Sequence, residues 1–389
     1  MNKNIQSNIW KLALGTFLHE LLFLAAVIVP FLSELGLSMQ QILITETFFS
    51  ATIMFLEIPS GYFADRVGRK ISIVLGSLFW IIGLFFYVEC NNFWWLCLGA
   101  IFWGIGTSFN SGANEAMLYE TLLQVNREKE YKKIQGNIFF YGRIASIVSS
   151  ILGGMLALIS LKLTAYATLV PIIICFCISL SLYETKHKKT NHETWQHFKK
   201  IFEESFLHNK KLRYFIIFSA IGGFYSIEFW LDQKYWENLK IPIYYFGIIV
   251  AGMSLFSAFG SKYAKEIEEK IGIKNSLIMI AVIPICVWLV FANAPTIWII
   301  PLFFIPSGLR GFFVPIFNDF VQKNVSSDRR ATIMSVMSLF QRMIFFIFAP
   351  FLGWITDIYS IQMAFLLMAI ILIIFVGLNF FCLKKESIL

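Results

Sequence analysis

A carboxylate and an imidazole stand side by side in the first apolar stretch of the chain, at Glu20 and His19. A charge in the middle of a bilayer costs roughly 2.5–3.5 kcal/mol even on insertion scales, so such groups are retained where they face a wet cavity or a partner. A carboxylate in that position can bind a proton and release it when an arginine or a solute approaches. We therefore interpret Glu20 as a candidate proton carrier and His19 as its modulator.

Other polar side chains also stand inside apolar runs. Glu115 is the second candidate proton carrier, and Arg143 and Arg342 are candidate alternating partners of a carboxylate. The candidate solute-binding residues are polar or aromatic and lie within such runs: Asn110, Asn114, Tyr119, Tyr225, Glu228, Arg310, Phe312 and Gln341. Static ion pairs and ordinary helix packing are the alternative interpretation, and it applies most to Asp232 and Asp319, near the ends of their runs.

The composition identifies the elements that must position these groups. Of the 389 residues, 58% are hydrophobic and only 14% are charged, and the mean hydropathy is +0.70. A water-soluble domain of this composition would expose mostly apolar surface. A helix crosses the ~30 Å hydrocarbon core with roughly 20 residues. We predict an all-α integral membrane protein with twelve transmembrane helices, near 9–34, 40–63, 71–89, 93–121, 134–159, 163–183, 213–236, 242–263, 275–293, 296–321, 332–356 and 361–382.

Charge determines the expected orientation. Most of the 32 Lys and Arg residues face one side of the membrane if both termini are cytoplasmic, as the positive-inside rule requires. The net charge of +8 therefore reflects topology, and we expect no nucleic-acid partner. The one long polar break predicts three parts: a six-helix bundle over 1–183, a cytoplasmic linker over 184–211 and a second bundle over 212–389. Apolar residues at helical spacing predict a surface helix in the linker, with a plain linker as the alternative: Trp195, Phe198, Ile201, Phe202 and Phe206.

The two halves carry similar residues at one constant spacing along the chain. The matching pairs are Gly61 and Gly260, Glu120 and Asp319, Arg143 and Arg342, and Gly154 and Gly353. Four pairs at one spacing indicate a duplicated six-span unit. Two pseudo-symmetric six-helix bundles of this kind hold a solute between them near the middle of the membrane.

One motif follows the second predicted span, and its fixed positions are Gly61, Asp65, Arg66, Gly68, Arg69 and Lys70. Gly61 would allow two helices to approach closely, and Gly68 would allow a tight turn. Asp65 can accept hydrogen bonds from a helix N-terminus or from a neighbouring arginine, and the basic residues would hold the loop in the cytoplasm. We interpret the motif as a conformational gate.

This motif resembles the loop 2–3 signature of the major facilitator superfamily, G-x-x-x-D-[RK]-x-G-[RK]-[RK], at every fixed position. The segment from Gly260 to Lys274 resembles a degraded second copy, and the segment from Ser327 to Ser335 resembles the family's loop 10–11 region. The resemblance covers essentially the whole chain. It implies the major facilitator fold, in which spans one, four, seven and ten line a central cavity.

The resemblance to the drug and metabolite:proton antiporter group implies proton-coupled export of a small organic solute by alternating access. We expect a monomer in a bacterial-type inner membrane whose partners are solute, protons and lipid. Two departures from the sequence pattern of the family's exporters weaken the prediction of export. Ala100 replaces the arginine that many family exporters carry four residues before a glycine, here Gly104. The antiporter pattern of span five lacks its proline and persists only as small residues: Ala145, Ser149, Ser150, Gly153 and Gly154.

These departures and the intramembrane arginines favour an alternative, proton-coupled carriage of an organic anion in either direction, such as a carboxylate metabolite or a siderophore. A membrane receptor or a lipid scramblase built on a transporter fold is an alternative of another class. Enzymatic function is not predicted. The zinc-protease pattern H-E-x-x-H fails because Phe23 occupies the second histidine position, and no phosphate-binding G-x-x-x-x-G-K-[ST] loop is present. The six cysteines form no CxxC pair, so we expect no metal and no cofactor.

Overall fold

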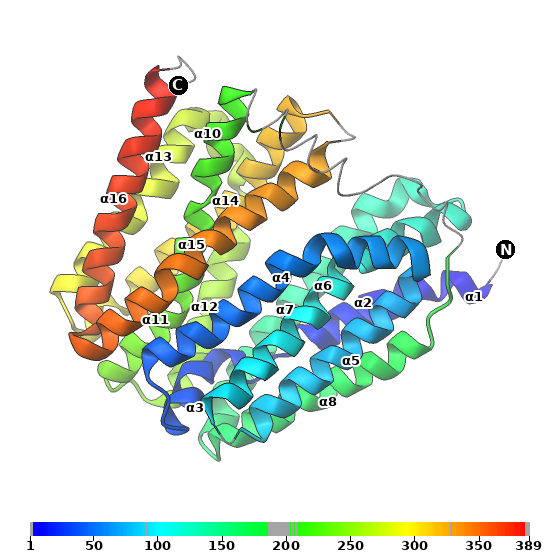
Figure 1. Ribbon diagram of the computed structural model, residues 1–389, viewed down its shortest axis with the longest axis horizontal. Helices are drawn as coiled ribbons and strands as arrows, with labels where there is room; N and C mark the ends of the chain where they lie inside the picture. The colour runs from blue at the N-terminus through cyan, green and yellow to red at the C-terminus, as the bar shows by residue number, and fades with distance from the viewer. Residues whose placement is uncertain are drawn as a thin grey trace. The chain divides into compact units, whose positions relative to one another are not determined.

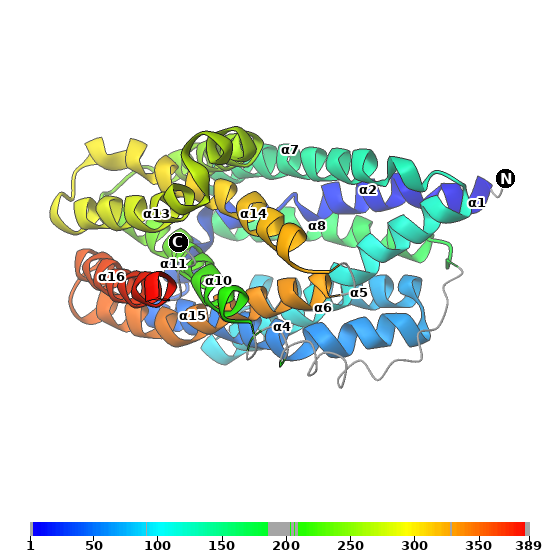
Figure 2. The same ribbon diagram turned by 90° about the horizontal axis from the view of Figure 1, so that it is seen from above.

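The computed structural model describes residues 3–90, 92–185, 203, 206, 209–326 and 329–385, and their regular structure consists of helices (Figures 1 and 2). These residues belong to two compact units. The first unit comprises Met1–Leu35, Phe48–Thr194 and Pro242–Ala251, and the second comprises Gly36–Thr47, Trp195–Ile241 and Gly252–Leu389. Two long helices, α4 (Met39–Val67) and α12 (Ile243–Lys262), contribute to both units.

Helices α5 and α6 form the most extensive pair of the first unit. The helices of this unit, besides its share of α4 and α12, are α1 (Lys3–Gln6), α2 (Asn8–His19), η1 (Ala25–Val27), α3 (Ile28–Glu34), α5 (Arg69–Val88), α6 (Phe93–Gln124), η2 (Glu128–Glu130), α7 (Tyr131–Ala157) and α8 (Leu161–Leu180). Helix α5 packs against α6 and α8, and α2 packs against α7 and α8. These helices carry the predicted site residues of the first half of the chain.

Helix α13 is the centre of packing in the second unit. Besides the shared helices, the helices there are α10 (Lys210–Ser219), α11 (Ile221–Asn238), α13 (Ala264–Asn293), η4 (Ile297–Phe303), α14 (Phe304–Asn324), α15 (Arg330–Ile358) and α16 (Ile361–Lys385). Helix α13 packs against α14 and α16, and α11 packs against α15.

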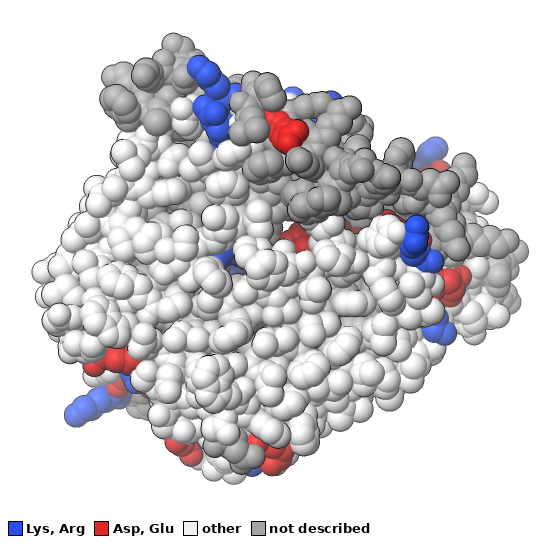
Figure 3. Space-filling view, in the orientation of Figure 1, with Lys and Arg blue, Asp and Glu red and all other residues white. Residues whose placement is uncertain are grey.

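Ten helices of the described residues are long and apolar enough to cross a membrane. The space-filling view shows the matching surface: most of the face drawn carries no charged side chain, and Lys, Arg, Asp and Glu gather mainly toward its margins (Figure 3). Helix α6 is not among the ten, although its 32 residues are long enough to span, because Trp, Gly and Asn dilute its apolar content. The chain is therefore a multi-pass membrane protein.

The predicted helices differ from the structure at three places. The prediction of one continuous helix over 9–34 is wrong, because α2 ends at His19 and helical structure resumes at η1 and α3. Pro30 lies in the first turn of α3, where its missing N–H needs no partner. The span near 213–236 consists of α10 and α11, and α13 begins earlier than 275, with a kink at Gly272 (φ 79°).

The linker helix predicted around Trp195 lies outside the described residues, apart from Phe206. The ring of Phe206 packs against that of Phe340 on α15, with centroids 5.4 Å apart. The surface helix therefore stays a prediction.

Glycines set the spacing between α5 and α6. A Cβ added to Gly76 would lie 2.8 Å from the carbonyl oxygen of Gly106, and a Cβ added to Gly106 would lie 2.6 Å from that of Gly76. Gly83 and Gly99 face each other in the same way two turns further on. The two backbones are in contact because these positions carry no side chain, as is usual between membrane helices.

Candidate functional site

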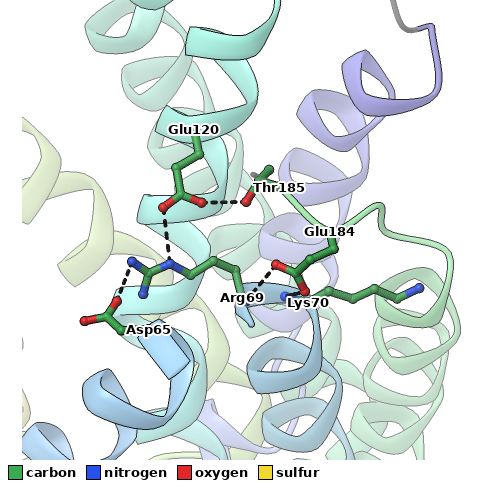
Figure 4. A network of polar contacts seen from close by, with 6 residues as sticks. All are labelled: Asp65, Arg69, Lys70, Glu120, Glu184 and Thr185. Atoms are coloured by element: carbon green, nitrogen blue, oxygen red, sulfur yellow. Dashed lines mark hydrogen bonds and ion pairs between the residues drawn. The ribbon is translucent and has the colours of Figure 1, made fainter. Parts of the chain in front are cut away.

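The predicted gate motif forms a polar network at the junction of α4 and α5 (Figure 4). The carboxylate of Asp65 pairs with the guanidinium of Arg69 at 2.6 Å, so of the two partners expected for Asp65 the neighbouring arginine is present. Arg69 Nε also donates to Glu120 of α6 at 3.4 Å, and the other oxygen of Glu120 accepts from the hydroxyl of Thr185. Three helices are thus connected through one guanidinium.

The N-terminus of α5 is capped from a distant part of the sequence. The two oxygens of Glu184 accept from the backbone N–H groups of Arg69 at 2.9 Å and Lys70 at 3.1 Å (Figure 4). A carboxylate here satisfies two free donors and lies at the positive end of the helix dipole. Gly68 precedes the helix with φ 134° and ψ 151°, a backbone region that is essentially restricted to glycine, so the expected tight turn is present.

Gly61 does not have the close helix contact expected for it. A Cβ added to Gly61 would meet no atom of the described residues within 4 Å, so the close helix contact expected at this residue is not present among them. Its counterpart in the second copy, Gly260 of α12, does have such a contact, because an added Cβ would lie 2.0 Å from the carbonyl oxygen of Gly308. Arg66 of the motif places its guanidinium over the ring of Tyr62, 4.8 Å from the ring centroid.

A cavity of about 190 Å³ lies within the first unit, between α2, α5, α6 and α8. The polar part of its lining comes from hydroxyls, amides, an ammonium group and an imidazole: Lys11, Thr16, His19, Ser77, Thr107, Asn110, Ser111, Asn114 and Ser179. An apolar cavity of ~150 Å³ can admit benzene. This cavity therefore has room for a solute of about one substituted ring, and its lining offers both apolar surface and hydrogen bonds.

The imidazole of His19 forms part of an aromatic wall of this cavity. Its ring lies 3.9 Å from that of Trp80 and 6.0 Å from that of Trp103, measured between centroids. The indole nitrogen of Trp80 is occupied, because it donates to Thr107 at 3.2 Å. His19 Nε2 is inaccessible to solvent and has no hydrogen-bond partner among the described residues. Since buried polar atoms are normally paired, an unpaired ring nitrogen is unusual at this position.

Two predicted solute-binding residues lie together on the wall opposite α2. Asn110 donates to the carbonyl oxygen of Gly106 at 3.0 Å, and Asn114 donates to the side-chain oxygen of Asn110 at 3.3 Å. Gly76 makes room for this pair, because a Cβ added there would lie 2.0 Å from the amide nitrogen of Asn110. The remaining donor and acceptor positions of the two amides can serve a polar solute.

Glu20 lies at the break in the first predicted span. It is the residue that ends α2, and its backbone carbonyl accepts from the hydroxyl of Ser149 on α7 at 3.3 Å. A Cβ added to Gly142 of α7 would lie 3.4 Å from Glu20 Cγ, and the next residue, Arg143, is close enough to act on the carboxylate electrostatically. Non-helical backbone at membrane depth is tolerated where it is buried in protein or lines a cavity. The break thus places the Glu20 carboxylate next to His19 of the cavity wall and near Arg143 of α7, although neither Glu20 nor Arg143 lines the cavity itself.

Several other predicted site residues do not line this cavity. Glu115 and Tyr119 are exposed on α6, and the ring of Tyr119 packs edge-on against Tyr131 at 5.5 Å. In the second unit, Phe312 is 1% exposed and buried in the interior. Gln341 packs across Gly222 of α11, and Arg342 follows it on α15. The structure therefore does not gather all predicted site residues into one group.

A second cavity, of about 10 Å³, gathers three predicted residues in the second unit. Tyr225 and Glu228 of α11 and Arg310 of α14 all line it. The same lining includes Asp232, which we had interpreted as a charge near the end of a span. Asp232 is in fact 1% exposed.

Sequence reasoning missed three residues of these sites. Asp232 follows Glu228 by one helical turn, so the spacing of the two acids could have identified it. The sequence marks Glu120 only by its place in the repeat, and Glu184 falls at the start of the predicted linker. No local signal identifies Glu184, because its partners lie more than a hundred residues earlier in the chain.

Comparison with known proteins gives consistent matches. The family model described as Major Facilitator Superfamily matches residues 12–350 and 233–387. A protein of Buchnera aphidicola subsp. Schizaphis graminum (strain Sg), named "Uncharacterized transporter", is 27% identical over 256 residues, which are 62% of this chain and 62% of that protein. This chain therefore spans less than two thirds of that relative's length.

Solved structures agree over nearly the full chain. The nucleoside transporter NupG matches with a TM-score of 0.81 and 17% identity, over 99% of this chain and 100% of that one. A bacterial homologue of the human lysosomal transporter Spinster, inward-facing and unoccupied, matches with a TM-score of 0.76 and 14% identity, over 99% and 98%. At these identities the likeness shows the fold alone.

Proposed function

Because the chain belongs to the major facilitator superfamily and is a transporter rather than an enzyme, we propose that it exports a small organic solute in exchange for protons. The observation that carries the proposal is the polar and aromatic cavity of the first unit, with His19 on its wall and Glu20 at the adjacent helix break. A solute needs such a lining for its polar groups, and a proton needs a carboxylate that a nearby guanidinium can discharge.

The cavity favours a flat heterocyclic solute. A ring can stack on the His19–Trp80 wall, while its polar atoms reach the amides of Asn110 and Asn114. NupG, which is similar in fold, is named a nucleoside transporter. Nucleobases and nucleosides therefore belong in a first ligand screen, together with aromatic drugs and organic acids.

Alternating access is the mechanism that this proposal requires. Two six-helix bundles, over 1–183 and 212–389, would alternately open a shared solute path to either side of the membrane. In this arrangement α6 and the broken segment from α2 to α3 complete twelve crossings, both termini face the cytoplasm of a bacterial-type inner membrane, and the protein works as a monomer. The network around Arg69 would hold one of the two states.

A thermal-shift screen of the purified protein, followed by solute flux into proteoliposomes, tests the proposal. We expect at least one heterocyclic compound to raise the unfolding temperature, and Asn110→Leu to weaken its binding about tenfold or more, since the amide hydrogen bonds are worth ~1–3 kcal/mol together. Glu115→Gln, on the exposed face of the same helix, should leave binding unchanged. A proton gradient should drive flux of that compound. Binding that Asn110→Leu does not alter would remove the cavity from the proposal.

Lys11 favours a second candidate, carriage of an organic anion. Lys11 is 8% exposed and lines the cavity. Its ammonium group donates to the carbonyl oxygen of Ser181 and lies over the ring of Tyr183 at 4.7 Å. An ammonium group has three donors, so a solute carboxylate could occupy another one. Lys11→Met separates the two candidate functions. It should abolish binding of an organic anion, whereas its affinity for a neutral heterocycle should stay within a few-fold of the wild-type value.

A further inference from the structure

Two acidic residues of α11 are buried together in the second unit. Glu228 and Asp232 are 4% and 1% exposed, and they stand one helical turn apart on the same face. Carboxylates are rarely buried unless they are paired, because desolvation strongly disfavours the charged form. The partners available to these two acids therefore decide what the site contains.

The partners present are sufficient for one carboxylate only. Glu228 accepts a hydrogen bond from the indole nitrogen of Trp288 at 2.7 Å, and the guanidinium of Arg310 acts on it electrostatically. Both carboxylate oxygens of Asp232 are inaccessible to solvent, and neither has a hydrogen-bond partner in the described part of the chain. If both acids are ionised, two carboxylates and one guanidinium leave one negative charge without a partner.

The cavity that Asp232 lines has the size of a single ion. Its volume of about 10 Å³ corresponds to roughly one water-sized sphere. Its lining includes Ser307, whose hydroxyl donates to the carbonyl oxygen of Phe303, and Tyr225, whose hydroxyl donates to that of Ile280. Both hydroxyl oxygens therefore keep lone pairs for a cation. An organic solute does not fit.

We propose that this site binds one monovalent metal cation of the size of sodium, between Glu228 and Asp232. Oxygen ligands from carboxylates and hydroxyls are those that hard cations prefer. One positive charge balances the site, whereas a divalent cation would leave an excess positive charge next to Arg310. The cation would satisfy the two unpartnered oxygens of Asp232. The proposal goes beyond the proposed transport function and uses no residue of the first-unit cavity and neither Glu20 nor Arg143, so either can fail alone.

The test measures sodium binding to the purified full-length protein. Binding of ²²Na⁺ is measured by equilibrium dialysis at neutral pH, and unfolding temperature is compared in sodium, potassium and choline chloride at equal ionic strength. We expect one sodium per chain and a higher unfolding temperature in sodium than in choline. Asp232→Asn should weaken binding about tenfold or more. The matched control is Glu237→Gln, which removes an acid of the same helix that already pairs with Lys234 at 2.8 Å, and binding should be unchanged.

Three results would overturn the proposal. The first is saturable sodium binding that Asp232→Asn does not weaken, and the second is no sodium binding at all. The third is stabilisation by acid pH that is the same in sodium and choline, which would mean that a proton neutralises the pair. If Asp232→Asn does not fold, Ser307→Ala removes one hydroxyl ligand without altering charge. Sodium affinity must then fall several-fold, and an unaltered affinity would equally exclude the site.

Discussion

Replacing Glu184 by alanine leaves the first two backbone N–H groups of α5 without their acceptors. Loss of an N-terminal cap costs about 0.5–2 kcal/mol, and loss of a negative charge at the positive end of a helix costs about 0.3–1 kcal/mol. Glu184 is exposed, so water can replace it in part. We therefore expect Glu184→Ala to lower the free energy of unfolding by about 1–2 kcal/mol.

Gly68→Ala acts on the same junction in two ways. The backbone conformation of Gly68 costs other residues about 1–3 kcal/mol. In addition, the new Cβ would lie 2.6 Å from Glu184 Oε2 and would push that side chain off the cap. The cap is thus lost in either variant. The loss of free energy of unfolding in the double variant should therefore be smaller, by about 1–2 kcal/mol, than the summed losses of the two single variants.

Chemical denaturation in mixed micelles of constant composition measures the free energies of unfolding of the wild type, the two single variants and the double variant. Lys70→Ala is the matched control, because it truncates the neighbouring side chain and keeps the backbone N–H that Glu184 accepts from. It should change stability by less than about 0.5 kcal/mol. Additive effects of Gly68→Ala and Glu184→Ala, or equal effects of Glu184→Ala and Lys70→Ala, would refute the assignment of Glu184 as the cap.

Two further predictions concern the gate and the packing of the first unit. Asp65→Asn weakens the pair with Arg69 and should slow solute exchange by about tenfold or more while solute affinity, measured by thermal shift, changes little. Equal losses of binding and exchange would exclude a switching role. Gly76→Ala introduces a Cβ 2.0 Å from the amide of Asn110 and 2.8 Å from Gly106, so it should destabilise the protein by about 1–3 kcal/mol. Gly112→Ala, on the same helix as Asn110 and with open space around it, should be neutral in the same denaturation experiment, and equal effects of the two would contradict the packing.

The long helices could be predicted because apolar runs of the right length leave few alternatives in a membrane. The break after His19 was missed because Leu21, Leu22, Phe23 and Leu24 continue the apolar run without interruption. Pro30 was the available signal, since a proline favours a helix start within the preceding turn. The broken helix matters because it places Glu20 at a free helix end beside α7.

Contacts between neighbours along one helix could be predicted from the sequence. Asn110 and Asn114, one turn apart, do meet, and so do Asp65 and Arg69. Contacts between distant segments could not be read from one sequence. Glu184 reaches α5 from the end of α8, and the exposure of Glu115 depends on which face of α6 its neighbours cover.

The central claim is that proton movement and solute movement are coupled through Glu20. Purified protein is reconstituted into proteoliposomes that hold an internal pH dye, and a gradient of a solute identified by the ligand screen is applied without a pH gradient. We predict that solute flow drives protons in the opposite direction, that a protonophore abolishes the pH change, and that Glu20→Gln binds solute normally but moves no protons. Solute flux without any pH change, or an undiminished pH change in Glu20→Gln, would contradict the account.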